Sequence, residues 1–268
     1  MWSRFLPGTG RWQRAALTEG RRNKMRHMRK RPSTMLRMVP LPVPGRILFL
    51  LLAACHQQPA PRTTFPEADR DVAPIVSDSF STEDARDRIG EAEEVMRMAG
   101  IKPGMSVADI GAGEGYYTIR LAPLVGATGR VLAEDIVPAV RDRLADRAQR
   151  ERLDNVAVKL GTPDNPSLPP ASFDRIFLVH MYHEVTSPYA FLWHLRGGLK
   201  PGGQVIVVDA DRPTKRHGTP PERLLCEFAA LGLKPVKQLP IPGADGYFVA
   251  FEIAAERPKP AAIVPCGA

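Results

Sequence analysis

Five consecutive residues, His180-Met181-Tyr182-His183-Glu184, bring two imidazoles, a phenol and a carboxylate together. Imidazoles and carboxylates are common general bases, which could take a proton from a hydroxyl or an amine. We therefore treat His183, Glu184 and His180 as candidate catalytic residues, with simple hydrogen bonding to a loop as the alternative. The HExxH frame of zinc proteases is absent and no cysteine is near in sequence, so no metal ion is expected here.

A glycine-rich segment, Asp109-Ile110-Gly111-Ala112-Gly113-Glu114-Gly115, stands between a strand-like run and a helix-like stretch. Glycines there allow a tight turn and bring backbone N–H groups close to a ligand at a helix N-terminus. The dinucleotide fingerprint GxGxxG would need a third glycine at position 116, where this chain has the much bulkier Tyr116. The segment therefore argues against a nicotinamide or nucleotide-sugar enzyme.

The GxGxG segment resembles motif I of class I S-adenosylmethionine-dependent methyltransferases. The resemblance implies S-adenosylmethionine as the cofactor, and a role for Asp109 in orienting the loop or, through water, the methionine amino group. The loop residues implied in cofactor binding are Gly111, Ala112, Gly113, Gly115 and Tyr116. The neighbouring Tyr117 is a further candidate catalytic residue, which we place with His183 and Glu184 on the substrate side.

An acidic pair, Glu134-Asp135, ends the second strand-like run. A carboxylate can accept hydrogen bonds from both hydroxyls of a ribose. Members of the resembled family, particularly the group like the ubiquinone-biosynthesis C-methyltransferases, carry an acid at this place. The resemblance therefore implies that Asp135, with Glu134 beside it, binds the cofactor. A solvated acid pair at a strand end is the alternative.

The segment 160–165 follows the third strand, where the family contacts adenine through an acidic or amide side chain. Many members have Asp directly after the glycine, whereas this chain has Thr162. The adenine contact is therefore left between Asp164, Asn165 and the backbone. Two further stretches match the family in order, at residues 172–177 and 199–203, and the resemblance covers about residues 82–253.

Helix-like and strand-like stretches alternate from residue 81 onward. One amphipathic helix is expected from Ser81 or Thr82 to Gly100. Strand-like runs follow at 106–110, 130–135, 156–160, 173–179, 204–209, about 235–240 and 247–252, and helix-like stretches at about 116–125, 138–151, 187–199 and 221–231. This alternation predicts an α/β fold, a Rossmann-like doubly wound sheet of seven mostly parallel strands. The short turn between the last two runs predicts an antiparallel C-terminal hairpin.

Residues 209–218 form a polar segment after the fifth strand. It could reach over the site and bind an anionic or polar substrate, but we expect a solvated loop of mixed charge. Cys226 lies in an apolar helical stripe and is expected in the core, whereas Cys266 lies in the Pro-rich tail. An oxidising compartment would permit a disulfide between them, but their positions do not support one, so none is expected.

The formal net charge of +8 comes entirely from the first 55 residues, which hold twelve Lys and Arg against one acid. The other 213 residues carry 25 Lys and Arg and 28 Asp and Glu. This mildly acidic remainder lacks the basic surface that binds phosphate backbones, so no nucleic-acid partner is expected.

An apolar run, residues 47–54, follows Arg46 and precedes Cys55. Eight apolar residues are too few to span a bilayer but fit a removable signal segment. Leu52-Ala53-Ala54-Cys55 resembles the lipobox of bacterial lipoproteins, which implies a lipidated Cys55 facing the periplasm, with a chance apolar patch and a cytoplasmic protein as the alternative. The predicted organisation is a leader and signal peptide over 1–54, a disordered tether over 55–80, the methyltransferase domain over 81–256 and a disordered tail over 257–268.

The sequence thus favours a methyltransferase acting on a small molecule, with a lipid anchor as its contact with the membrane and no prediction of oligomeric state. The alternative is a noncatalytic, ligand-binding lipoprotein of methyltransferase fold. One conflict favours that alternative: S-adenosylmethionine is made in the cytoplasm, whereas a lipobox sends the domain out of it.

Overall fold

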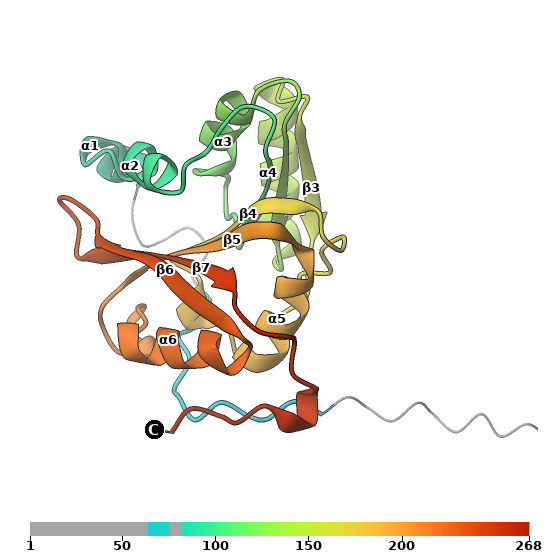
Figure 1. Cartoon of the computed structure of the whole chain (residues 1–268). Helices are drawn as coiled ribbons and strands as arrows, with labels where there is room; N and C mark the ends of the chain where they lie inside the picture. The colour runs from blue at the N-terminus through green and yellow to red at the C-terminus, as the bar shows by residue number, and fades with distance from the viewer. Residues whose placement is uncertain (1–63, 76–81, 268) are drawn as a thin grey trace, which may run out of the picture. The chain divides into compact units, whose positions relative to one another are not determined.

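The computed structural model describes residues 64–75 and 82–267, which lie in the second of the chain's two units, Gln58–Ala268. At the centre is a seven-stranded sheet of order β3-β2-β1-β4-β5-β7-β6 (Figure 1). Strands β1 to β5 are parallel, and β7 lies antiparallel between β5 and β6. The predicted Rossmann-like α/β fold with an antiparallel C-terminal hairpin is confirmed.

The strands are β1 (Ser106–Ile110), β2 (Arg130–Asp135), β3 (Val156–Leu160), β4 (Phe173–Val179), β5 (Leu199–Ala210), β6 (Leu233–Pro240) and β7 (Gly246–Ile253). The first four coincide with the strand-like runs of the sequence. Strand β5 starts at Leu199 rather than Gln204, because Leu199 already pairs with Phe173. The Pro-Gly-Gly turn is taken up as an irregularity in the register between Phe173 and Arg175.

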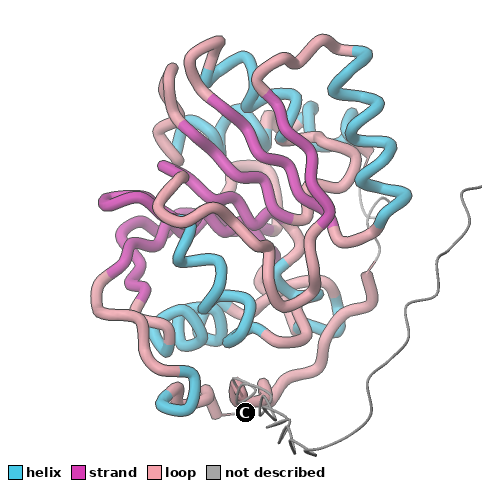
Figure 2. The backbone as a smooth tube through the Cα atoms, turned by 90° about the vertical axis from the view of Figure 1, so that its right-hand side faces the viewer, coloured by secondary structure: helices cyan, strands magenta, loops and turns pink. Residues whose placement is uncertain are grey.

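The helices are α1 (Glu83–Arg88), α2 (Glu91–Met98), α3 (Thr118–Val125), α4 (Pro138–Arg150), α5 (Pro188–Leu195) and α6 (Pro221–Ala230). Helices α2 and α3 pack on one face of the sheet and α5 and α6 on the other, while α4 packs on β2 and β3. The layered arrangement is visible in Figure 2, where the strands lie between helices.

Both faces of the central strands are buried, which explains why these strands read as continuous apolar runs. In β1, Val107 packs into the cluster under α2 and α3, whereas Ala108 and Ile110 pack into the cluster with α5 and α6. This alternation follows from the two-residue period of a strand. It leaves the carboxyl ends of the strands, rather than their faces, as the place where polar side chains gather.

The amphipathic stretch before β1 forms two helices, so the prediction of a single helix is wrong. Thr82 caps α1 by accepting a hydrogen bond at its hydroxyl from the Ala85 N–H, 3.3 Å away. Gly90 then adopts a left-handed φ of 64° and ends the first helix. Such a conformation is easy for glycine and turns the chain between α1 and α2.

Residues 64–75 pack against the domain, so the prediction of a disordered tether is wrong for them. The buried Arg70 side chain donates hydrogen bonds to the carbonyls of Tyr182 and Val185, at 3.2 and 2.8 Å. It also lies 3.5 Å from a carboxylate oxygen of the fully buried Glu227. Residues 55–63 and 76–80 of the predicted tether lie outside the described residues.

The C-terminal segment is also part of the fold, in contrast to the predicted disordered tail. Cys226 of α6 and Cys266 form a disulfide with Cα atoms 6.0 Å apart, so the expectation of no disulfide is wrong. Ile263 and Cys266 are each only 6% exposed, and the Cys266 N–H donates to the Tyr189 hydroxyl over 2.7 Å. The segment returns to the domain over forty residues of sequence, a proximity that local sequence patterns do not encode.

Among residues 64–75 and 82–267, no helix has both the length and the apolar character needed to cross a lipid bilayer. The predicted signal segment and Cys55 lie outside the described residues.

Candidate active site

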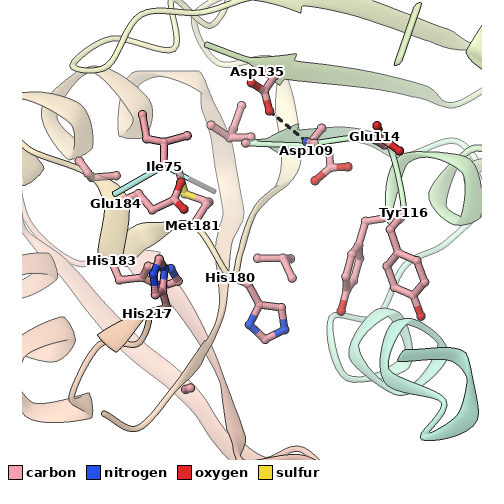
Figure 3. A pocket seen from close by; sticks show the side chains of 18 of the residues that line it. Ile75, Asp109, Glu114, Tyr116, Asp135, His180, Met181, His183, Glu184 and His217 are labelled. Atoms are coloured by element: carbon pink, nitrogen blue, oxygen red, sulfur yellow. Dashed lines mark hydrogen bonds between the residues drawn. The ribbon is translucent and has the colours of Figure 1, made fainter. Parts of the chain in front are cut away.

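A cavity of about 640 Å³ opens at the carboxyl ends of β1, β2, β4 and β5. It lies where β1 and β4 are neighbours and the order of strands reverses, which is the usual ligand position in an open α/β sheet. The glycine loop borders one side of it, and the residues after β4 and β5 border the other (Figure 3). The structure therefore brings most of the predicted site residues to one cavity.

The glycine loop has left-handed backbone angles at three positions, with φ of 65° at Gly111, 56° at Gly113 and 90° at Gly115. A Cβ atom on Gly115 would lie 2.4 Å from Cδ1 of Leu144, so glycine is required for α4 to approach the loop. A Cβ atom on Gly111 would lie 2.9 Å from the Met181 side chain. The loop is therefore fixed between β2, α4 and the residues after β4.

Hydrogen bonds connect the glycine loop to the end of β2. The Gly113 N–H donates to Oδ2 of Asp135 over 3.0 Å, and the Val137 N–H donates to Oδ1 over 2.8 Å. The Ala112 N–H donates to the Glu134 carbonyl over 2.9 Å. A carboxylate offers about four lone pairs, so Asp135 can still accept a hydrogen bond from a ligand.

Asp109 lies beneath the loop and is only 2% exposed. Its carboxylate accepts a 2.6 Å hydrogen bond from the Thr118 hydroxyl in the first turn of α3. Burial raises the pKa of Asp109 to about 6, and the hydrogen bond from Thr118 opposes that rise. Asp109 thus fixes the start of α3 relative to β1.

Glu134 is more deeply buried than Asp135 and is only 1% exposed. Its Oε1 atom has no hydrogen-bond partner within the part of the chain that the structure describes. Burial, together with the nearby charge of Asp135, raises the pKa of Glu134 to about 8. Gly161 faces this carboxyl, and a Cβ atom there would lie 1.0 Å from Oε1. A buried polar atom in need of a partner is what a ligand hydroxyl could satisfy.

Tyr116 points away from the glycine loop, toward α1. Its hydroxyl donates to Asp87 over 2.8 Å, and its ring lies between the guanidinium groups of Arg86 and Arg120, each 3.9 Å from the ring centroid. This placement explains how a tyrosine is accommodated where the dinucleotide fingerprint has glycine. The ring supports the cavity wall beside α1.

The first of two imidazole–carboxylate pairs joins His180 to Glu91 of α2, with Nε2 and Oε2 3.2 Å apart. The other oxygen of Glu91 accepts hydrogen bonds from the Tyr117 hydroxyl over 3.0 Å and from Arg86 over 2.6 Å. Burial disfavours the charged form of Glu91, but hydrogen bonds and charge from His180 and Arg86 lower its pKa to about 2. Arg86 of α1 and Glu91 of α2 stand outside any sequence motif, so no pattern in the sequence pointed to them.

The second pair joins His183 to Asp209 at the end of β5. Nδ1 of His183 lies 3.0 Å from Oδ1 of Asp209, and both side chains are buried. Asp209 is held in turn by the Thr219 hydroxyl at 2.8 Å and by the Ala210 N–H at 2.9 Å. The prediction that 209–218 is a solvated loop is wrong at Asp209, whose side chain is fully buried because it anchors His183.

His217 lies over His183, with ring centroids 5.4 Å apart and ring planes at 86°. Partial burial and the neighbouring His183 lower the pKa of His217. One nitrogen of each histidine and one oxygen of Glu184 all lie within 4.8 Å of one another. Figure 3 shows His183, His217 and Glu184 on one side of the cavity and His180 nearer Tyr116.

Two of the predicted site residues, Gly115 of the glycine loop and the predicted adenine contact Asp164, are not among the described residues that line the cavity. Asp164 is exposed, its Oδ1 accepts from the Thr162 hydroxyl over 3.2 Å, and it is not among the described residues that line the cavity. Thr162 and Pro163 line the cavity instead. The loop after β3 therefore presents a hydroxyl and a proline ring at the place where the resembled family has an acid or amide.

The fold has the architecture of class I S-adenosylmethionine-dependent methyltransferases. Residues 107–203 match the family model described as a methyltransferase domain. The crystal structure of a SAM-dependent methyltransferase from Aquifex aeolicus is similar, with a TM-score of 0.60 at 23% identity, over 63% of this chain and 93% of that one.

Two relatives found by sequence are also methyltransferases. The ubiquinone/menaquinone biosynthesis C-methyltransferase of Pseudomonas putida is 31% identical over 128 residues, which is 45% of this chain and 48% of that protein. The enzyme of the same description from Ectopseudomonas mendocina is 33% identical over 125 residues, 44% of this chain and 46% of that protein. The chain thus aligns with about half the length of these relatives.

Proposed function

We propose that the protein is an S-adenosylmethionine-dependent methyltransferase that acts on a small molecule. The observation that carries the proposal is the hydrogen bond from the Gly113 N–H to Asp135, which joins the glycine loop to an acid at the edge of a cavity. The imidazoles of two imidazole–carboxylate pairs line the same cavity and could accept a proton there. Its volume of about 640 Å³ is in the range of small-molecule sites.

The residues at the ends of β1 and β2 fit S-adenosylmethionine. Asp135 retains lone pairs for ribose hydroxyls, and Glu134 offers a buried oxygen that lacks a partner in the described chain. Gly111, Ala112 and Gly113 of the glycine loop line the cavity, so a bound ligand would lie beside their backbone. When bound, S-adenosylmethionine supplies an electrophilic methyl group on its sulfonium.

The acceptor would lie on the side of His180 and His183. In each pair a carboxylate engages one ring nitrogen and so orients the imidazole, which leaves the other nitrogen to take a proton from a hydroxyl or an amine. Tyr117 acts through Glu91, because its hydroxyl donates to that carboxylate. We therefore assign Tyr117 to positioning the His180 pair.

Calorimetry tests the cofactor assignment directly. The purified protein should bind S-adenosylmethionine and should not bind NAD. Binding of NAD with no binding of S-adenosylmethionine would overturn the proposal.

We also propose that the domain is exported and anchored by a lipid on Cys55, facing the periplasm. The support is the lipobox-like Leu52-Ala53-Ala54-Cys55 and the Cys226–Cys266 disulfide, because disulfides persist mainly in oxidising compartments. Fatty-acid labelling and fractionation test this proposal: wild type should be labelled and membrane-bound, and Cys55→Ser should be unlabelled. A soluble, unlabelled wild-type protein in the cytoplasm would contradict it.

The disulfide also favours a second candidate, a noncatalytic protein that binds its ligand outside the cytoplasm, where S-adenosylmethionine is not made. Transfer of label from isotopic S-adenosylmethionine to a membrane-associated metabolite extract separates the two candidates. A protein that binds the cofactor but labels no fraction supports the noncatalytic candidate.

A further inference from the structure

We propose that His183, His217 and Glu184 form a binding site for a divalent transition-metal ion beside the cofactor cavity. The sequence predicted no metal ion, because the HExxH frame is absent and no cysteine is near in sequence. The fold brings the three side chains together after β4 and β5, with a potential ligand atom from each within 4.8 Å of the others. The site is additional to the methyl-transfer activity proposed above.

The donor set is chemically specific. Two imidazoles and one carboxylate suit zinc, iron or another first-row transition ion, whereas magnesium and calcium prefer sites made of oxygen ligands alone. Three protein ligands are the usual number in catalytic metal sites, which keep a position open for water or substrate. All three residues line the cavity, so an open position would face the space that a ligand can enter.

Asp209 supplies an independent observation. Metal-bound histidines commonly donate their second ring N–H to a carboxylate, which fixes the tautomer and the ring orientation. Nδ1 of His183 is 3.0 Å from Asp209, so Nε2 is the nitrogen left for a metal ion. Asp209 is fully buried and held by Thr219 and the Ala210 N–H, so this orientation is built into the core.

The three ligand atoms need to move only slightly closer together to bind an ion. Tetrahedral zinc with bonds of 2.0–2.1 Å to nitrogen places ligand atoms about 3.4 Å apart. The present separations reach 4.8 Å. His217 and Glu184 are partly exposed, and rotation of their side chains could close this gap while His183 stays fixed by Asp209.

With a metal ion bound, the two imidazole–carboxylate pairs would have different roles in methyl transfer. This part of the inference rests on the proposed function. A hydroxyl of the acceptor bound to the ion through oxygen would lose its proton more readily, because the ion stabilises the alkoxide. The proton would pass to His180. The oxygen would then form its bond to the methyl carbon while the carbon–sulfur bond breaks, with the electron pair remaining on sulfur.

Metal binding can be measured without any activity assay. The full chain, purified without a histidine tag, should bind one equivalent of Zn²⁺ in calorimetry and should show visible ligand-field bands with Co²⁺. His183→Asn keeps a donor near the position of Nδ1 for Asp209 but removes Nε2. His217→Asn suits the left-handed backbone at that position, where φ is 57°. Both variants should therefore fold and lose the metal.

The matched control is His194→Asn, which makes the same replacement in a histidine of α5 that contacts the Asp164 carbonyl at 3.0 Å. This variant should bind Zn²⁺ as wild type does. Asp209→Asn should weaken Zn²⁺ binding by about 10–100-fold, the usual effect of removing an outer-sphere carboxylate, and the two ligand variants should lose more.

Wild type that binds neither Zn²⁺ nor Co²⁺, or ligand variants that bind them as wild type does, would overturn the metal site. Calorimetry with S-adenosylmethionine on the same samples separates the two proposals. Zn²⁺ binding without cofactor binding would remove the proposed function and keep the metal site, and the reverse result would remove the metal site alone.

Discussion

Cys226 in α6 is covalently joined to Cys266, close to the C-terminus of the chain. The bond holds the final segment where the Cys266 N–H reaches the Tyr189 hydroxyl of α5, at 2.7 Å. The indole N–H of Trp193 donates to the Pro258 carbonyl over 2.9 Å and fixes the start of the same segment. The C-terminal residues thus cover the two helices that support the His183 side of the sheet.

Loss of this disulfide should destabilise the protein by about 2–4 kcal/mol. A bond that closes a loop of forty residues mainly restricts the unfolded chain, and reduction or Cys266→Ser removes that restriction. Urea unfolding with and without a reductant measures the effect. Without reductant, Cys266→Ser should have the same stability as reduced wild type. Equal stability of wild type with and without reductant would show that the bond does not form in solution.

Arg70→Met should cost about 3–5 kcal/mol, because it leaves the buried Glu227 without its cation and two carbonyls without a donor. Urea unfolding measures this loss of stability. The control is Arg97→Met, which removes an exposed ion pair with Glu94 and should cost far less. Similar losses in the two variants would mean that residues 64–75 are not part of the folded domain.

Glu134→Gln should change the pH dependence of stability. In the folded protein the pKa of Glu134 is raised from 4.5 to about 8. The protonated carboxyl group therefore stabilises folded wild type at low pH, and this stabilisation is lost as the pH rises from about 4.5 to 8. Glutamine does not titrate, so the stability of the variant relative to wild type should grow over that window and level off above pH 8. At about 1.4 kcal/mol per pKa unit, the gain should amount to a few kcal/mol. Unfolding curves at pH 5, 7 and 8.5 measure it, and a constant difference would contradict the raised pKa.

Asp135→Asn should weaken S-adenosylmethionine binding by roughly 10–100-fold, the scale of a charge-assisted hydrogen bond lost to a ligand. Calorimetry on folded protein measures the affinity. Asp164→Asn is the matched control, because that exposed side chain is not among the described residues lining the cavity, and its affinity should be unchanged. A larger loss in Glu134→Gln than in Asp135→Asn would transfer the ribose contact to Glu134.

The sequence predicted the sheet well because its signal is local. The runs at β1 to β4 are short and rich in apolar and β-branched residues, and their limits match the structure. The single helix before β1 was wrong because Gly90 is compatible with helical periodicity on either side, and only the backbone shows its left-handed turn. The disulfide was missed because it depends on a return of the chain over forty residues.

The site was predictable only where residues adjoin in sequence. The glycine loop and the pair Glu134-Asp135 could be recognised because each motif is continuous. Glu91, Asp209 and His217 come from separate elements, and their roles depend on contacts that sequence spacing does not show. Asp164 shows the opposite failure, since a suitable residue in the right loop is turned to solvent.

Substitution of His180 tests whether this imidazole is the general base. If this imidazole takes the proton of the acceptor, His180→Gln should lower kcat about 10²–10⁴-fold and leave the affinity for S-adenosylmethionine unchanged, because proton removal matters only in the transition state. Tyr117→Phe keeps the ring and removes one hydrogen bond to Glu91, so it should cost much less. Transfer of label from isotopic S-adenosylmethionine to a membrane-associated extract gives the rates.

The rate of methyl transfer by His180→Gln should rise with pH, as hydroxide replaces the missing base. A flat profile with an unchanged kcat would assign the proton to His183 and leave His180 as a residue that only positions Glu91.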